Sequence, residues 1–138
     1  MSNKKIQVKL PNVAQRQYDI VIGEGVVKSL VSVIKKQCVS NVVIITDSNV
    51  KKLYGDKLLC DLKPKLTTYS LQLTAFLSGE KNKTQETVTK LQNEMFKLKC
   101  GRGTLVVALG GGVVGDTAGY VAATYMRGVS FVQVPTTL

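Results

Sequence analysis

The sequence predicts an α/β protein with a mostly parallel β-sheet flanked by helices and with an N-terminal β-hairpin. From residue 42 onward, short apolar segments alternate with longer segments of helical periodicity, the order found in parallel sheets with helices on both faces. These short segments are continuously apolar, as strands covered on both faces are. Residues 6–10 and 18–23 instead alternate apolar and polar side chains, which predicts the hairpin.

Length and composition are those of a single soluble domain. The 138 residues are 44% hydrophobic and 20% charged, enough for one core, so residues 1–138 are treated as one domain. The chain has no apolar run of about 18 residues and no signal-peptide core, so we expect a cytoplasmic protein that does not enter a membrane. Three widely spaced cysteines and the absence of histidine argue against disulfides and an internal Cys/His metal site.

The net charge of +10 is compatible with nucleic acid, an acidic membrane surface or a phosphorylated small molecule as a partner. All basic residues except Arg16, Arg102 and Arg127 are lysines, and they are dispersed along the chain. Aromatic residues are few, and no nucleic-acid recognition motif is present. These features favour a lysine-rich solvated surface, and we expect no nucleic-acid partner.

The first predicted elements are two strands and a helix. Pro11 and Asn12 break the chain between the strands at residues 6–10 and 18–23. Residues 25–36 carry apolar side chains at helical spacing, and two lysines at the end suit the negative pole of the helix dipole.

The next predicted elements are a buried strand, a helix and a second strand. Residues 42–46 form a β-branched run that ends at Asp47, and Ser48 or Asn49 is expected to cap the following helix. The inward-facing residues of this helix are expected to be Val50, Leu53, Tyr54 and Leu58. Residues 66–73 are predicted to form the next strand.

The remaining segments continue the alternation. Residues 78–84 contain turn formers and precede a long amphipathic helix that ends at residues 101–103. Its apolar face is expected to contain Val88, Leu91, Met95 and Leu98. A buried strand at residues 105–109, a helix at 113–126 and a strand at 131–134 complete the predicted order.

The strongest motif is a glycine-rich segment between a predicted strand and a predicted helix. Gly110-Gly111-Gly112-Val113-Val114-Gly115-Asp116 contains G-x-G-x-x-G. Such glycines let the backbone turn tightly and approach a pyrophosphate, and the start of the helix favours anionic oxygens. The alternative is a tight turn that only permits close helix packing. A surface turn needs fewer glycines, so we favour nucleotide binding in a Rossmann-like domain.

Three charged residues lie near the predicted ends of strands and helices. In the usual dinucleotide fold an acidic residue follows the motif by about 20 positions, but Gln133 occupies that region. Asp47, at the end of an earlier strand, is the better candidate for the ribose, and a helix N-cap is an equally open role for it. Asp116 is expected in the first turn of its helix, where the dipole favours a carboxylate whether or not it also contacts a ligand. Arg127 is expected either to donate hydrogen bonds to the last carbonyl groups of the helix or to bind a carboxylate or phosphate.

Residues 108–116, 118–128 and 134–138, with the sequences ALGGGVVGD, AGYVAATYMRG and VPTTL, resemble those of 3-dehydroquinate synthases. The resemblance extends more weakly to residues 46–50 and 79–83. It implies an NAD-dependent lyase of the shikimate pathway, in aromatic amino acid biosynthesis. Such an enzyme converts 3-deoxy-D-arabino-heptulosonate 7-phosphate, a phosphorylated keto acid, to 3-dehydroquinate and phosphate, and uses a divalent metal, zinc or cobalt.

The resemblance also implies roles for particular residues. The nucleotide contacts that it implies are Asp47 and Asn49 on the adenosine side, Glu80 and Lys83 from the loop at Gly79, Gly111, Gly112 and Val113 at the pyrophosphate, Asp116 at the nicotinamide-side ribose, and Thr136 and Thr137 at the nucleotide's edge. Arg127 resembles a substrate-binding arginine. No residue of this chain corresponds to a catalytic residue or to a metal ligand of the family.

Two departures from the family pattern qualify these roles. Leu77 and Ser78 stand where a proline commonly precedes the Gly-Glu pair. The C-terminal helical domain, which carries the family's glutamate and two histidine metal ligands, is absent, as are the polar residues expected after the Pro-Thr-Thr-Leu segment. We therefore expect a fragment that contains the nucleotide-binding part and is inactive alone.

Alternative functions stay open at this stage. Other sugar-phosphate cyclases and metal-dependent polyol dehydrogenases share this nucleotide-domain architecture, and a domain of this kind can also be retained as a non-catalytic binding scaffold. The sequence leaves self-association as a homodimer undecided.

Overall fold

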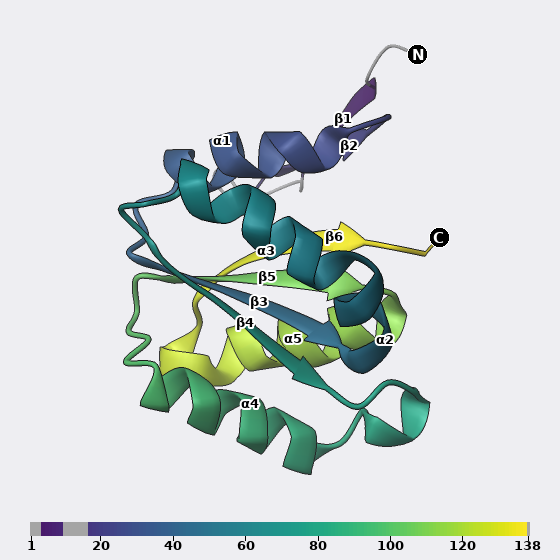
Figure 1. Cartoon of the computed structure of the whole chain (residues 1–138), viewed down its shortest axis with the longest axis vertical. Helices are drawn as coiled ribbons and strands as arrows, with labels where there is room; N and C mark the ends of the chain where they lie inside the picture. Colours follow the sequence, from purple (N-terminus) through teal and green to yellow (C-terminus); the bar gives the residue numbers. More distant parts are fainter. Residues whose placement is uncertain (1–3, 10–16, 138) are drawn as a thin grey trace.

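Four parallel strands form the central sheet of the computed structural model, which describes residues 4–9 and 17–137 (Figure 1). The strands are β3 (Asn41–Asp47), β4 (Ser70–Phe76), β5 (Thr104–Gly110) and β6 (Ser130–Pro135). Their order in the sheet is β4-β3-β5-β6. The parallel register pairs Asp47 with Phe76 and Gly110 with Pro135, so all four strands end at one edge. We call this the carboxyl edge.

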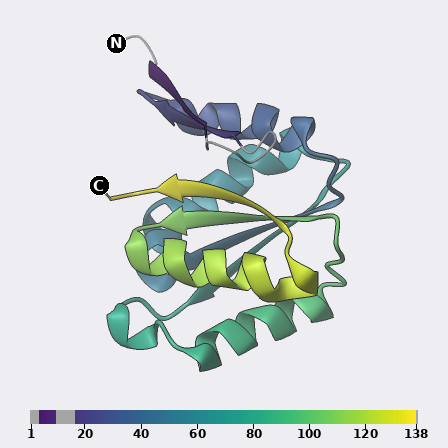
Figure 2. The same ribbon diagram turned by 180° about the vertical axis from the view of Figure 1, so that it is seen from behind.

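Helices cover both faces of the sheet. One face carries α1 (Leu30–Lys36), α2 (Ser48–Val50) and α3 (Asp56–Leu62), and the other carries α4 (Gln85–Lys97) and α5 (Gly112–Thr124) (Figures 1 and 2). Short turns of helix lie at η1 (Val26–Ser29), η2 (Lys51–Gly55), η3 (Lys63–Lys65), η4 (Glu80–Asn82) and η5 (Tyr125–Arg127). The predicted α/β fold class is confirmed.

The two central strands supply both halves of the core. Successive side chains of a strand point to opposite faces. Val43 and Ile45 pack with α4 and α5, whereas Val42 and Ile44 pack with α1 and α3. All four side chains are fully buried, which explains why this segment is continuously apolar.

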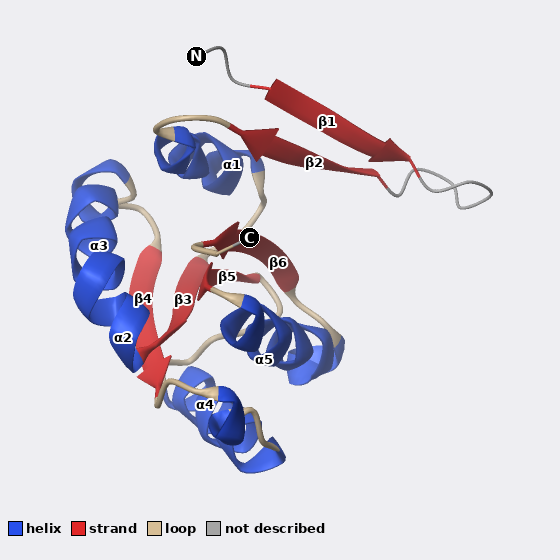
Figure 3. Cartoon of the chain, turned by 90° about the vertical axis from the view of Figure 1, so that its right-hand side faces the viewer, coloured by secondary structure: helices blue, strands red, loops and turns tan. Residues whose placement is uncertain are grey.

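The N-terminal strands form the predicted antiparallel hairpin. β1 (Lys4–Lys9) pairs with β2 (Gln17–Ile22), and Ile6 lies opposite Ile20. Figure 3 shows the hairpin extending beside α1 and away from the four-stranded sheet. The predicted break at Pro11 and Asn12 lies outside the described residues.

The helix after β3 differs from the prediction in its cap and its buried face. Asp47 is the N-cap, not Ser48 or Asn49. Leu53 and Tyr54, which were expected to face inward, are 67% and 54% exposed. A π-helical turn at η2 is the cause, because its wider i→i+5 pattern rotates the following residues relative to a regular α-helix.

Two other boundaries were predicted wrongly. The strand expected at residues 66–73 is β4 at Ser70–Phe76, because Leu66 enters the core from the end of η3 before the strand begins. Leu98 follows α4 and is largely exposed, and Lys99 adopts a positive φ of 55° that leads the chain out of the helix. Each helix within the described ranges is too short or too polar to cross a bilayer.

Candidate functional site

The glycine motif forms the turn from β5 into α5 at the carboxyl edge. Gly111 is the N-cap of α5 and has no side chain with which to cap it. The first amide groups of a helix have no partner within the helix, and the positive end of the helix dipole lies there. The amide groups at the start of α5 can therefore donate hydrogen bonds to an anionic oxygen.

The glycines of this turn serve two different purposes. A Cβ atom at Gly110 would lie 2.5 Å from Cγ2 of Val114, and one at Gly111 would lie 2.9 Å from Oγ1 of Thr137. Close packing thus accounts for these two positions. A Cβ at Gly112 would meet no heavy atom of the described residues within 4 Å. The packing alternative does not explain Gly112, whose bare backbone is open to a ligand.

The structure gives Asp47 the capping role and leaves its second carboxylate oxygen unpaired among the described residues. Its Oδ1 accepts hydrogen bonds from the amides of Asn49 at 2.8 Å and Val50 at 2.9 Å, which caps α2. Oδ2 makes no hydrogen bond or ion pair with any other described residue. The side chain is half-buried at the end of β3. One oxygen therefore holds the helix, and the other is available to a ribose hydroxyl.

The loop between β4 and α4 brings a cation to α5. Gly79 has a φ of 106°, which favours glycine, and η4 follows it directly. The ammonium group of Lys83 lies 2.6 Å from Oδ2 of Asp116 and 3.6 Å from Oε1 of Glu80. The hydrogen bond to Asp116 raises the pKa of Lys83 above its usual value, and the charges of Asp116 and Glu80 act in the same direction.

Asp116 lies one turn further into the helix than predicted. No acidic residue stands in the first turn of α5. Asp116 is exposed and faces the loop at Gly79, where Lys83 is its partner. The predicted placement of Asp116 in the first turn, where the helix dipole is felt most, was therefore wrong.

The end of β6 packs against the glycine turn. The amide of Thr136 donates to the carbonyl oxygen of Gly110 at 3.1 Å. The side chain of Thr137 lies over Gly111. Both threonines are exposed and border the start of α5.

Arg127 does not join the other predicted residues. It lies in η5 at the opposite end of α5 from Gly112, and twelve residue steps of helix span about 18 Å. Its φ of 70° lies in the left-handed region, as does that of its neighbour Met126. Within one copy of the chain, Arg127 is therefore outside the carboxyl-edge site.

Sequence reasoning missed Ser78 and gave Ser48 only a capping role. The Ser48 hydroxyl accepts from the Ser78 amide at 3.2 Å and donates to the Ser78 hydroxyl at 3.3 Å. The two residues are 30 positions apart, so no local pattern signals the contact. Asn82 donates from Nδ2 to the carbonyl oxygen of Ser78 at 2.8 Å.

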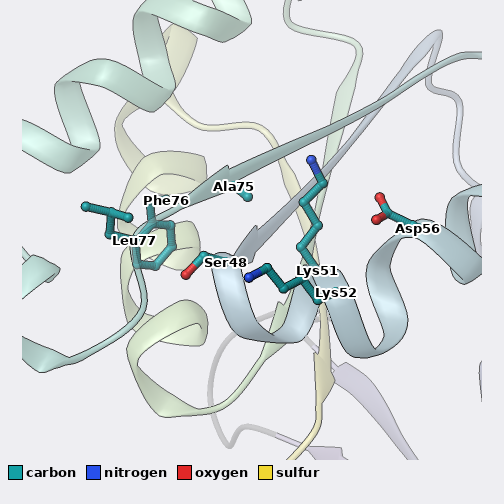
Figure 4. Close-up of a pocket in the computed structure, with 7 residues that line it drawn as sticks. All are labelled: Ser48, Lys51, Lys52, Asp56, Ala75, Phe76 and Leu77. Carbon is teal, nitrogen blue, oxygen red and sulfur yellow. The ribbon is translucent and has the colours of Figure 1, made fainter.

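A pocket opens beside this site at the end of β4 (Figure 4). Its lining residues are Ser48, Lys51, Lys52, Asp56, Ala75, Phe76 and Leu77. Ser48 is shared between the pocket wall and the contact with Ser78.

The described side chains suit a nucleotide but not a metal ion. Across residues 4–9 and 17–137, no three His, Cys, Asp or Glu side chains gather at one place. Cys38 and Cys60 are exposed, whereas Cys100 is buried and burial raises its thiol pKa. The residues of the carboxyl edge thus provide amides, hydroxyls and carboxylates without a metal-binding cluster.

This fold and site define the Rossmann-like class of α/β domains, in which ligands bind outside the carboxyl ends of the strands. Residues 73–138 match the family described as 3-dehydroquinate synthase N-terminal. The chain is 43% identical over 125 residues to a 3-dehydroquinate synthase of Bacillus cytotoxicus, covering 89% of this chain and 33% of that protein. The chain is thus similar to 3-dehydroquinate synthases over most of its own length and spans about a third of the length of such curated relatives.

Solved structures of related enzymes have the same fold. A 2-deoxy-scyllo-inosose synthase complexed with carbaglucose-6-phosphate, NAD+ and Co2+ matches with a TM-score of 0.83 and 30% identity, over 97% of this chain and 35% of that chain. A 2-epi-5-epi-valiolone synthase from Streptomyces hygroscopicus with NAD+ and Zn2+ bound matches with a TM-score of 0.74 and 26% identity, over 94% of this chain and 35% of that chain.

Proposed function

We propose that this chain is the NAD-binding part of a 3-dehydroquinate synthase. As a whole, such an enzyme is a lyase that converts 3-deoxy-D-arabino-heptulosonate 7-phosphate to 3-dehydroquinate and phosphate. The observation that carries the proposal is the meeting of three features at the carboxyl edge: the glycine turn at Gly112, the free oxygen of Asp47 and the Lys83–Asp116 pair. The 3-dehydroquinate synthase relatives and the NAD+-bound structural neighbours support it.

The order of the strands supports Asp47 as the ribose ligand. In the usual dinucleotide fold the glycine motif follows strand 1, the acidic residue follows strand 2, and the sheet order is 3-2-1-4. Here β5 carries the glycine turn and its neighbour β3 carries Asp47, in the order β4-β3-β5-β6. Asp47 thus occupies the place of the acidic residue in space, although it precedes the motif in sequence.

The remaining contacts follow from this placement. The first amides of α5 would hold the pyrophosphate above Gly111, Gly112 and Val113. Asp47 and Asn49 would hold the adenosine-side ribose, with Glu80 and Lys83 beside them. NAD supplies a reversible hydride acceptor to the reaction when it is bound.

The further contacts implied by the family are proposed as follows. Asp116 would meet the nicotinamide-side ribose, and Thr136 and Thr137 would border the nucleotide where the end of β6 meets the glycine turn. Arg127 would contact the phosphorylated keto acid and not the nucleotide, because it lies at the other end of α5. Replacing Arg127 with alanine should therefore leave NAD affinity unchanged.

The described residues do not fit the divalent metal that the structural neighbours hold. Neither a histidine nor a cluster of suitable ligands is found in residues 4–9 and 17–137. We propose that zinc or cobalt is bound by a part of the enzyme other than this chain. The 138-residue chain alone is accordingly expected to bind NAD without turning over substrate.

Calorimetric titration of NAD into the 138-residue chain tests the proposal. The expected result is saturable binding that Asp116→Ala weakens and that is stronger for NAD than for NADP, whose added phosphate would approach Asp47. Circular dichroism would verify that both proteins are folded. A folded wild-type chain that does not bind NAD would overturn the proposal of a preformed nucleotide site.

A further inference from the structure

We infer that Ser48 is a positioning residue that joins the two loops carrying the proposed adenosine contacts. The inference rests on the proposed NAD site. Ser48 directly follows Asp47, and its hydroxyl bonds to the amide and hydroxyl of Ser78 at 3.2 and 3.3 Å. Ser78 precedes Gly79, where the loop that carries Glu80 and Lys83 begins. The Ser48–Ser78 contact therefore connects the turn after β3 to the loop after β4.

The contact begins where the strand pairing stops. β3 and β4 are paired up to Asp47 and Phe76, so the amide of Ser78 lies beyond the last paired residues. The hydroxyl of Ser48 supplies the acceptor for this amide beyond the paired part of β3. Figure 4 shows Ser48 beside Phe76 and Leu77 at the end of β4. Its hydroxyl thus extends the connection between the two strands by one step.

Side chains hold Ser78 from two directions. Its amide donates to Ser48, and its carbonyl oxygen accepts from Asn82 within the loop. No other hydrogen bond among the described residues joins residues 47–50 to residues 77–84. Loss of the Ser48 hydroxyl would leave the loop attached through Lys83 and Asp116 but free to move relative to Asp47.

Removal of the Ser48 hydroxyl should affect nucleotide affinity more than the stability of the fold. Ser48 and Ser78 lie at the edge of the sheet and belong to neither cluster of the hydrophobic core. Removing the hydroxyl should leave the core packing intact while the loop occupies more conformations. A nucleotide that contacts both loops would then have to restrict them on binding, which lowers affinity.

The test is NAD binding by the 138-residue chain with four single substitutions. Ser48→Ala is expected to weaken NAD binding about three- to tenfold, the effect of one neutral hydrogen bond, with little change in thermal midpoint. Ser48→Thr keeps the hydroxyl and should restore affinity. Ser78→Ala keeps the amide that donates to Ser48 and should have a smaller effect. Ser130→Ala, at the opposite edge of the sheet, is the matched control and should bind as the wild type does.

Amide hydrogen exchange at Ser78 gives a second readout. Exchange should be faster in the Ser48→Ala chain than in the Ser48→Thr or Ser78→Ala chains. Wild-type affinity in Ser48→Ala, equal weakening in Ser48→Thr, or a fall in thermal stability that accounts for the lost binding would each overturn the positioning role. If the folded wild-type chain fails to bind NAD, the proposed function fails and this inference fails with it. If only Ser48→Ala is without effect, the proposed function stands.

Discussion

The ammonium group of Lys83 lies 2.6 Å from the carboxylate of Asp116 and ties the loop after β4 to the second turn of α5. Glu80 adds a second, longer contact to the same ammonium group. Two segments that are separate in the sequence, the loop after β4 and the second turn of α5, thus meet at the carboxyl edge.

The Lys83–Asp116 pair predicts a pH dependence at alkaline pH. The pKa of Lys83 is raised, so the attraction is fully present below the unfolded value of about 10.4 and is lost as the pH rises through the higher folded value. Lys83→Met should therefore lower the thermal midpoint by a constant small amount at neutral pH. Melting curves of the two proteins should begin to converge as the pH rises past about 10.4 and should coincide once the pH exceeds the raised folded pKa of Lys83. A difference that persists there would show that the methylene chain of Lys83, and not its charge, stabilises the loop.

Gly110 and Gly112 should respond differently to alanine. Gly110→Ala would place a methyl group against buried Val114 and is expected to lower the free energy of unfolding by about 1–3 kcal/mol. Gly112→Ala should leave stability nearly unchanged but weaken NAD binding by about tenfold or more, because its methyl group occupies the ligand's approach. Urea unfolding and NAD titration of both variants measure the two effects. Unchanged NAD affinity in a folded Gly112→Ala chain would favour a glycine turn without a nucleotide.

Two substitutions of Asp47 should distinguish its role as a helix cap from its proposed role in nucleotide binding. Asp47→Asn keeps the capping oxygen and should retain stability, while loss of the charge weakens binding of the ribose. Asp47→Ala also removes the cap from α2, and its free energy of unfolding should fall by about 1 kcal/mol. Comparison of the two variants by thermal unfolding and NAD titration checks this division. Equal NAD affinity for wild type and Asp47→Asn would limit Asp47 to its capping role.

Two buried threonines should respond in opposite ways to substitution by valine. The hydroxyl of Thr117 is buried in α5 and has no hydrogen-bond partner in the described part of the chain. Thr117→Val should therefore stabilise the protein by about 1 kcal/mol. The hydroxyl of Thr46 donates to the carbonyl oxygen of Leu109 at 2.7 Å, so Thr46→Val should destabilise it by about 1 kcal/mol. Chemical denaturation measures the change in the free energy of unfolding for each variant, which should be positive for Thr117→Val and negative for Thr46→Val. A loss of stability in Thr117→Val would indicate an unrecognised partner for that hydroxyl.

Several features of this protein could be predicted from the sequence because they depend on neighbouring residues. The runs at β3 and β5 are continuously apolar because helices cover both faces of these strands, and this local pattern determined the parallel α/β class. The glycine turn was placed between strand and helix for a similar reason, since its backbone geometry involves only adjacent residues. The place of Asp47 at the end of a strand made it the candidate for the ribose, and the family resemblance then supplied the proposed roles of Lys83 and Asp116.

The tertiary structure alone decided which of these residues meet. Lys83 and Asp116 are 33 positions apart, and Ser48 and Ser78 are 30 apart, so their contacts arise only when parallel strands bring their ends to one edge. The π-helical turn at η2 exposed Leu53 and Tyr54, which a regular helix would have buried. Sequence periodicity determines which faces are apolar, whereas distances between polar side chains depend on how the whole chain packs.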